Sequence, residues 1–181
     1  RNACKPGDII LTTGIHGLSK LGFLIQNKIN FDNEFSLNER LIIKSIEHFC
    51  RPRVYPNFLN NLLKTRSNKN IRRIGCTDSS DGLFQALQDL AIASNCKAII
   101  NYEKIPKDKD WPKGDKWDEY YFFGGEDYEL VFSLPKKWAE NLSKLDKNIN
   151  EIGFFTDGEP SIEFKDYKKN KLFNNTPFKH F

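Results

Sequence analysis

Apolar residues recur along this chain with two different spacings, one typical of strands and the other typical of helices. Short apolar runs predict strands at residues 8–12, 98–102, 128–133, 152–156 and 161–164. The last two runs flank Asp157-Gly158, a dipeptide favoured where a hairpin turn requires positive φ. We therefore expect the last two strands to be antiparallel.

Apolar positions three and four residues apart predict helices between these strands. The clearest start lies at residues 36–39, where Ser-Leu-Asn-Glu has the form of a capping box with Ser36 as the cap. Ser19 is placed to cap an earlier helix, and Pro135 is placed to open a later one. Two further apolar stripes predict helices at residues 58–63 and 83–91.

The order of these elements predicts the architecture. Helices and strands alternate, which favours an α/β (α+β) sandwich in which helices cover a mixed sheet. A segment rich in Lys, Asp, Trp and Pro predicts a loop at residues 104–116. At 181 residues the chain has the length of one ordinary domain, so we treat residues 1–181 as a single domain.

Composition places the chain among globular proteins, because 39% of its residues are hydrophobic and 29% are charged. The longest apolar runs, such as residues 120–123, fall far short of the roughly 20 residues that a membrane span needs, so we expect no membrane contact. Cys4, Cys50, Cys76 and Cys96 form no C-x-x-C pair. Free thiols and a cytoplasmic location are therefore expected.

The net charge of +4 is small and by itself indicates no nucleic-acid partner. One basic cluster contains no acid; it consists of Lys64, Arg66, Lys69, Arg72 and Arg73. Such a cluster is either a solvated loop or an electrostatic site for phosphates or nucleic acid. We keep the second interpretation as an alternative.

The first candidate for chemistry is the segment 76–83, Cys-Thr-Asp-Ser-Ser-Asp-Gly-Leu, which directly precedes a predicted helix. Asp78 and Asp81 supply the hard oxygen ligands that Mg²⁺ prefers, commonly together with substrate phosphates and water. Ser80 and the start of the helix offer donors to a phosphate group. The competing interpretation is a simple helix cap by Ser80 or Asp81, with Gly82 in the turn.

The second candidate is Gly-Gly-Glu-Asp at residues 124–127, between an aromatic run and an apolar strand. Paired glycines let the backbone turn tightly beside a ligand, and Glu126 and Asp127 can accept hydrogen bonds from a substrate. A solvated turn would explain the same residues. Spacing alone does not decide between the two.

A glycine-rich segment at residues 12–19 lacks the spacing of a Walker phosphate loop, so glycines that pack at a strand-to-helix turn are the better interpretation. His16, His48 and His180 are widely separated in the sequence. We therefore expect neither a histidine metal site nor a Ser/His/Asp triad.

Together these segments resemble the thiamine-monophosphate kinases, a family related to aminoimidazole ribonucleotide synthetase, selenophosphate synthetase and a hydrogenase maturation protein. Residues 78–83 are similar to the family motif D-[IVS]-S-D-G-L, and residues 124–132 are similar to G-G-E-D-Y-E-L-[LV]-F. Weaker matches at residues 6–8, 13–22, 51–54 and 178–181 extend the resemblance over nearly the whole chain.

The resemblance implies a fold like that of the carboxy-terminal domain of aminoimidazole ribonucleotide synthetase. It also implies transfer of the ATP γ-phosphoryl group to thiamine monophosphate, with Mg²⁺ as the cofactor. The implied roles are metal binding by Asp78 and Asp81, nucleotide contact by Ser80 and Arg1, and substrate contact by Glu126 and Phe178. No protein nucleophile is expected, because direct transfer needs mainly positioning and neutralisation of phosphate charge.

The resemblance further implies an amino-terminal domain, absent from this chain, with other metal-binding aspartates, the rest of the nucleotide site and a dimer interface. We therefore expect the full-length protein to be a homodimer that binds ATP and thiamine monophosphate, and this chain alone to be inactive. Two alternatives stay open: a related ATP-dependent enzyme of the same superfamily, and a basic nucleic-acid-binding module.

Overall fold

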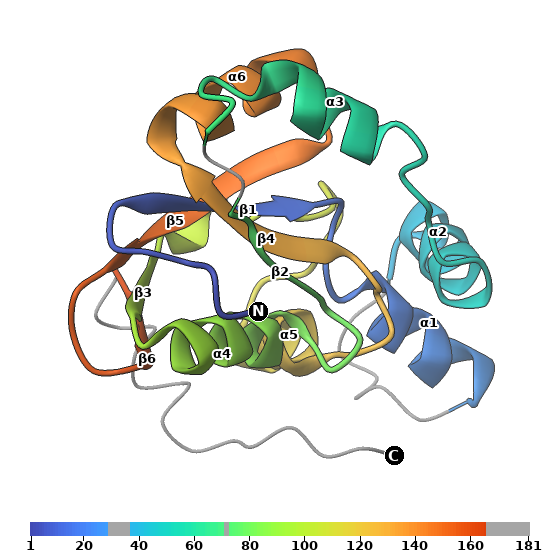
Figure 1. Cartoon of the computed structure of the whole chain (residues 1–181). Helices are drawn as coiled ribbons and strands as arrows, with labels where there is room; N and C mark the ends of the chain where they lie inside the picture. The colour runs from blue at the N-terminus through green and yellow to red at the C-terminus, as the bar shows by residue number, and fades with distance from the viewer. Residues whose placement is uncertain (29–36, 71–72, 166–181) are drawn as a thin grey trace.

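The structure is a computed structural model, which describes residues 1–28, 37–70 and 73–165. Its centre is a mixed six-stranded sheet with the strand order β2-β4-β1-β5-β3-β6 (Figure 1). The strands are β1 (Asp8–Thr13), β2 (Gly75–Asp78), β3 (Lys97–Ile100), β4 (Leu130–Pro135), β5 (Ile149–Thr156) and β6 (Ser161–Phe164). Neighbouring strands are antiparallel except β3 and β6, which are parallel.

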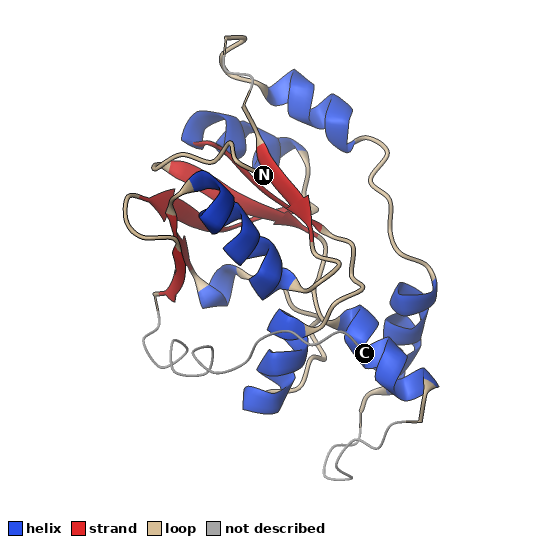
Figure 2. Ribbon diagram, turned by 60° about the horizontal axis from the view of Figure 1, so that its bottom comes forward, coloured by secondary structure: helices blue, strands red, loops and turns tan. Residues whose placement is uncertain are grey.

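Helices cover both faces of this sheet, so the predicted sandwich is confirmed (Figures 1 and 2). Helices α3 and α6 lie on one side, α4 and α5 lie on the other, and α1 and α2 pack together beside the sheet. Their bounds are α1 (Leu18–Gln26), α2 (Glu39–Cys50), α3 (Phe58–Thr65), α4 (Leu83–Ser94), α5 (Asp115–Phe123) and α6 (Lys136–Leu145). A short 3₁₀ helix, η1 (Tyr102–Lys104), follows β3.

The alternation of side chains along the strands separates two apolar cores. Leu11 and Phe132 face α3 and α6, where they pack with Trp138. Their strand neighbours Ile10 and Val131 face the larger core, which includes residues of α1, α4 and α5. Because successive residues of a strand point to opposite faces, one apolar run serves both cores.

The last two described strands, β5 and β6, are antiparallel as predicted, but they do not pair with each other as a hairpin. Gly158 has the positive φ of 139° expected of a turn. However, β3 lies between β5 and β6, so that Ala98 pairs with Phe155 on one side and with Ile162 on the other. Strand β3, which comes earlier in the sequence, occupies the position between β5 and β6.

Several local expectations need correction. Asn38 rather than Ser36 caps α2, because its side chain accepts a hydrogen bond from the Arg40 N–H at 2.8 Å, and Ser36 lies outside the described residues. The predicted loop at 104–116 ends in helix α5, which takes up the aromatic run. Strand β2 was not predicted, since its four residues, Gly-Cys-Thr-Asp, carry no apolar alternation.

Within the described parts of the chain, no helix combines the length and the apolar character needed to cross a lipid bilayer. All four cysteines are free, as the sequence predicted.

Candidate functional site

The sheet brings the two acidic segments of the sequence together. Strand β2 ends at Asp78 and pairs with the start of β4, so that Asp78 lies opposite Leu130. Beyond this pair, the Ser79 N–H donates to the Glu129 carbonyl at 2.8 Å, and the Glu129 N–H donates to Ser79 Oγ at 3.1 Å. The two segments, about fifty residues apart in the sequence, therefore form one rigid edge of the sheet.

A further backbone hydrogen bond joins the loops beyond that edge. The Glu126 N–H donates to the Ser80 carbonyl at 2.8 Å. Ser80 thus holds the second segment through its backbone, which leaves its hydroxyl outside this bond. Asp78, Ser80, Asp81 and Glu126 consequently lie in neighbouring turns.

Three half-buried carboxylates gather around the exposed ring of Tyr128. The Tyr128 hydroxyl donates to Glu126 Oε2 at 2.9 Å. This bond and the charge of Glu126 raise the pKa of Tyr128, and Asp78 and Asp81 add to the increase. The three predicted carboxylates therefore act on the same small region of the surface, as a site for cations would require.

The backbone of this loop has an unusual conformation. Glu126 and Tyr128 have positive φ values of 70° and 53°, in the left-handed region that residues with a side chain rarely adopt. Such conformations persist only where surrounding contacts hold them, and they are concentrated at functional sites. The contacts that hold this loop come from the two residues that alternate with Glu126 and Tyr128.

Asp127 points inward and caps helix α1. Its carboxylate accepts hydrogen bonds from the Gly17 N–H at 2.6 Å and from the Ser19 N–H at 3.0 Å. Burial raises the pKa of Asp127 to about 6, and the Gly17 and Ser19 bonds oppose that increase. The prediction that Ser19 caps the helix is therefore wrong, because a carboxylate more than a hundred residues away takes that role.

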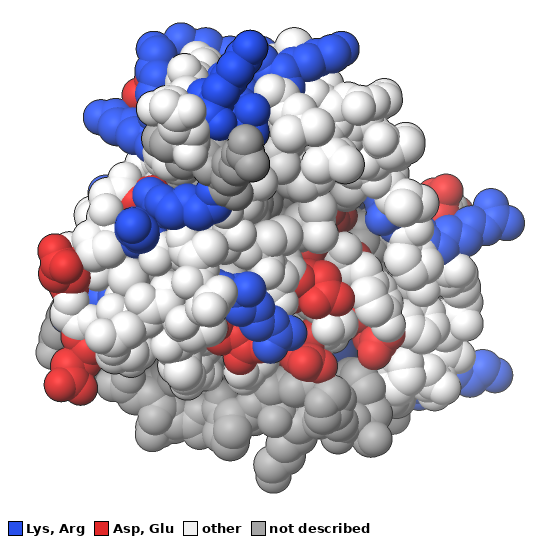
Figure 3. All heavy atoms as spheres, viewed as in Figure 1, with Lys and Arg blue, Asp and Glu red and all other residues white. Residues whose placement is uncertain are grey.

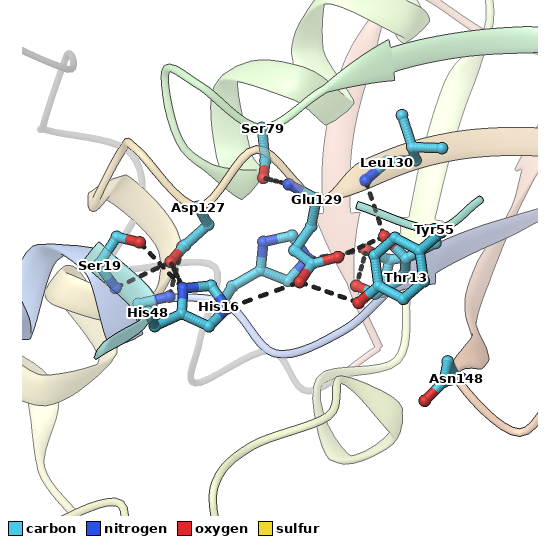
Figure 4. A network of polar contacts seen from close by, with 12 residues as sticks. Thr13, His16, Ser19, His48, Tyr55, Ser79, Asp127, Glu129, Leu130 and Asn148 are labelled. Carbon is cyan, nitrogen blue, oxygen red and sulfur yellow. Dashed lines mark hydrogen bonds and ion pairs between the residues drawn. The ribbon is translucent and has the colours of Figure 1, made fainter. Parts of the chain in front are cut away.

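Glu129 also points inward and holds a network of side chains from several elements (Figure 4). Its carboxylate accepts hydrogen bonds from the Thr13 hydroxyl at 2.5 Å and the Tyr55 hydroxyl at 3.1 Å, and His48 Nε2 lies 3.6 Å away. Burial would raise the pKa of Glu129, but the bonds from His48, Thr13 and Tyr55 outweigh it and lower the pKa. This carboxylate is thus held as an anion inside the protein.

The two described histidines belong to the same buried region. His48 Nδ1 lies 3.0 Å from Ser19 Oγ and 3.7 Å from Asp127 Oδ1. His16 Nε2 lies 2.7 Å from Thr12 Oγ1, and burial lowers the pKa of His16 to about 4. These histidines are therefore structural members of the network, while His180 lies outside the described residues.

The packing role predicted for the glycine-rich segment is confirmed at Gly14. A Cβ atom built on Gly14 would lie 1.9 Å from Glu129 Oε1, and its φ is +54°. Only a residue without a side chain allows the buried carboxylate to approach the turn after β1 so closely.

The remaining predicted residues lie apart from this centre or outside it. Arg1 donates from Nη1 to Asp89 Oδ2 at 2.5 Å, and Asp89 lies on helix α4, outside the two acidic segments. Phe178 lies outside the described residues. Within the described ranges, no three His, Cys, Asp or Glu side chains form a complete metal-binding group. The donors of Asp78 and Asp81 suit Mg²⁺, but they would supply only part of its coordination shell.

The basic cluster is divided by the structure. Arg73 forms a two-point ion pair with Asp8, in which Nη2 donates to Oδ1 at 2.7 Å, so its charge is used inside the fold. Arg72 lies outside the described residues. Figure 3 shows that other basic side chains spread over the part of the surface formed by α3 and α6, away from the acidic side chains lower in the view.

Tyr55 is also one of the residues that line a cavity of about 470 Å³. Residues 53–58, Asn61 and residues 145–148 line it, and it contains none of the three carboxylates that gather around Tyr128. It is therefore distinct from the acidic centre, although it shares Tyr55 with the buried network.

Residues 5–165 match the family described as AIR synthase related protein, C-terminal domain. The chain belongs to this family. The match includes every element from β1 to β6, and it agrees with the fold class predicted from the sequence.

Curated proteins similar to this chain are thiamine-monophosphate kinases. The enzyme of Prochlorococcus marinus is 33% identical over 181 residues, which are 100% of this chain and 54% of that protein. The enzyme of Synechococcus elongatus is 28% identical, again over 100% of this chain and 54% of the relative. The chain therefore spans about half the length of the curated relatives that it matches.

Solved structures give the same picture. A structure of AaThiL complexed with AMPPCP and TMP superposes with a TM-score of 0.71 at 25% identity, over 99% of this chain and 53% of that one. The thiamine monophosphate kinase of Aquifex aeolicus has a TM-score of 0.68 over 91% of this chain and 52% of that one, and at 24% identity it supports the fold alone.

Asp127, Glu129, His48 and Tyr55 are the residues of this centre whose places sequence reasoning did not find. No local signal separated the two directions, because Glu126 and Tyr128 have positive φ and the segment is not a regular strand. Glu126 is half-buried and Tyr128 is exposed, whereas Asp127 and Glu129 are buried.

Proposed function

We propose that this chain is the carboxy-terminal domain of a thiamine-monophosphate kinase, which transfers the ATP γ-phosphoryl group to thiamine monophosphate in the cytoplasm. The observation that carries the proposal is the joining of the two acidic motifs by backbone hydrogen bonds between residues 79–80 and residues 126–129. A helix cap and a solvated turn could explain the two motifs separately, but the hydrogen bonds bring their carboxylates into one centre. Relatives that match the entire chain add independent support.

The roles follow from the side chains that face outward. Asp78 and Asp81 hold Mg²⁺, which when bound neutralises phosphate charge. Ser80 and the start of α4 offer donors to the phosphates of the nucleotide. Glu126, oriented by its bond with Tyr128, accepts from the thiamine substrate. Arg1 and Phe178 are proposed as nucleotide and substrate contacts, respectively.

In this proposal the chain works together with an amino-terminal domain that supplies the remaining metal ligands, the rest of the nucleotide site and a homodimer interface. The described carboxylates would form only part of a metal shell, which is consistent with ligands from elsewhere. We expect this chain alone to show no turnover.

Substitution of Asp81 in the full-length protein tests the mechanism. Asp81→Asn keeps the size of the side chain and removes one metal-binding charge, so we expect kcat to fall about 100-fold, or ~2.7 kcal/mol. The measurement is a coupled ATP-to-ADP assay with and without thiamine monophosphate. Asp115→Asn, at an exposed carboxylate in the first turn of α5, is the matched control.

Either of two results would contradict the proposal: no stimulation of ATP turnover by thiamine monophosphate, or full activity in Asp81→Asn. The same assay separates the related-enzyme alternative, because that enzyme would respond to selenide or to a ribonucleotide instead. Salt-dependent binding of oligonucleotides would favour the basic-module alternative.

A further inference from the structure

Tyr55 lies in the segment between α2 and α3, far in sequence from both acidic motifs, yet its hydroxyl reaches the buried carboxylate of Glu129. From this geometry we propose that Tyr55, acting through Glu129, is a positioning residue that sets the placement of Glu126 and Asp78. The inference rests on the function proposed above. It assigns a role to a residue outside both motifs.

The Glu129 carboxylate is held from opposite ends. Tyr55 donates to Oε1 at 3.1 Å, while Thr13 donates to Oε2 at 2.5 Å. Thr13 Oγ1 also accepts from the Leu130 N–H at 2.8 Å, which fixes the backbone immediately after Glu129. The side chain of Glu129 is 1% exposed, so water cannot readily replace a lost donor.

Hydrogen bonds and the backbone connect Glu129 directly to the carboxylates that face outward. Its backbone N–H and carbonyl both bond to Ser79, the residue after Asp78. On its amino-terminal side stands Tyr128, whose hydroxyl bonds to Glu126. A displacement of Glu129 therefore moves Asp78 through Ser79, and it moves Glu126 through the backbone of the same short loop.

The conformation of the loop explains why it needs such an anchor. Glu126 and Tyr128 both have positive φ, and each of these conformations is disfavoured unless surrounding contacts hold it. The inward bonds of Glu129 are contacts of this kind. Loss of one of them should let the loop relax toward ordinary conformations, with Glu126 displaced from its working position.

Tyr55 is suited to act as a permanent donor. Burial is the largest cause that raises its pKa, and the charge of Glu129 and the hydrogen bond to it raise it further. The hydroxyl therefore keeps its proton throughout the pH range in which a kinase works. Tyr55 also lines the cavity of about 470 Å³.

A second tyrosine provides a matched control within the same chain. The Tyr102 hydroxyl donates to Asp118 Oδ1 at 2.5 Å, and like Tyr55 it is a half-buried residue whose pKa is raised mainly by burial. Asp118 lies in α5, outside the two acidic segments. Tyr102→Phe thus removes a tyrosine–carboxylate bond at another place, together with the hydroxyl that accepts from Lys107 Nζ.

The experiment compares Tyr55→Phe with Tyr102→Phe in the full-length protein, by steady-state kinetics and thermal unfolding. We expect Tyr55→Phe to raise KM for thiamine monophosphate about fivefold, because Glu126 is displaced, and to lower kcat about threefold, because Asp78 is displaced. Tyr102→Phe should leave both constants within twofold. A role in stability alone would lower the melting temperature of both variants and leave KM unchanged.

A double-substitution cycle tests the route through Glu129. Glu129→Gln removes the charge that Tyr55 orients, so Tyr55→Phe added to it should raise KM less than twofold further. Full additivity of the two effects on KM would overturn the proposed route. Glu129→Gln also replaces Tyr55→Phe as the test variant if the latter does not fold.

Backbone hydrogen exchange distinguishes failure of this inference from failure of the proposed function. In Tyr55→Phe, amides 126–130 should exchange at least about threefold faster than in the parent, whatever substrate the protein uses. Unchanged exchange together with unchanged KM would overturn the positioning role. Faster exchange in a protein that ignores thiamine monophosphate would overturn the proposed substrate and support the positioning of the loop.

Discussion

At the scale of single residues, the segment Glu126-Asp127-Tyr128-Glu129 separates two tasks by the direction of its side chains. Glu126 and Tyr128 face outward and bond to each other, whereas Asp127 and Glu129 face inward and receive donors from α1, β1 and the segment before α3. Two of these four consecutive polar residues therefore face the candidate site, and the other two hold the loop in place.

The buried His16 makes stability depend on pH. Its pKa is lowered from 6.5 to about 4, chiefly by burial, so between these values the unfolded chain binds a proton that the folded chain does not. Stability contributed by neutral His16 is therefore lost as the pH falls from 6.5 towards 4. Asp127, with its pKa raised from 3.8 to about 6, contributes in the opposite direction over an overlapping range.

Replacement of His16 should therefore change the pH profile of unfolding. We expect His16→Gln to lose less stability than the parent between pH 7 and pH 4, by on the order of 1–3 kcal/mol. Urea unfolding followed by circular dichroism at several pH values measures this difference. Thr12→Val, which removes the partner of His16 but keeps the titrating ring, should retain the loss in acid. Parallel profiles for His16→Gln and the parent would contradict the argument.

At the scale of elements, the pair of helices α1 and α2 places His48 and Ser19 beside the site. The two helices approach closely at Gly22, where a Cβ atom would lie 2.1 Å from the Ser45 carbonyl oxygen. The N-terminal end of α1 is held from outside the helix by Asp127. The position of this pair is therefore set by tertiary contacts at both points.

Gly22→Ala tests how close that approach is. Alanine is favoured over glycine inside a helix by roughly 1 kcal/mol, so the substitution would stabilise a helix with free space around it. Here we expect a loss of about 1–3 kcal/mol, because the methyl group meets the backbone of α2. Thermal or urea unfolding measures the change. An increase in stability for Gly22→Ala would show that the helices separate easily.

Local sequence patterns predicted some of the strands and helices and missed others. The apolar runs located β1, β3, β4, β5 and β6, because a buried strand needs a continuous supply of apolar side chains. Strand β2 has no such run, and it exists because β4 offers it an edge to pair with. Helix α5 was not predicted, because a short aromatic run by itself is compatible with a strand as well as with a helix.

At the scale of the whole molecule, one ion pair links the amino-terminal segment to the far edge of the sheet. Arg73, just before edge strand β2, holds Asp8 at the start of β1 and also donates to the Ala3 carbonyl at 3.1 Å. The Asp8 side chain is 2% exposed. A residue that the sequence assigned to a basic surface cluster is therefore a structural clamp.

Arg73→Lys keeps the charge and removes the planar pair of donors, so we expect a loss of about 1–2 kcal/mol of stability. Arg66→Lys, the same exchange in another member of the cluster, should change stability by less than about 0.5 kcal/mol. Chemical denaturation at constant pH compares the two. Equal effects would mean that the two-point bond to Asp8 contributes nothing beyond its charge.

The sequence by itself determined the class of fold, most of the strands and helices, and the two acidic motifs. These properties depend on local spacing, which a chain carries whatever its environment. The order of the sheet, the insertion of β3 between β5 and β6, and the inward direction of Asp127 and Glu129 were decided by the tertiary structure. Each depends on partners far away in the sequence, such as Thr13 and Tyr55 for Glu129, and local patterns do not encode which distant groups will meet.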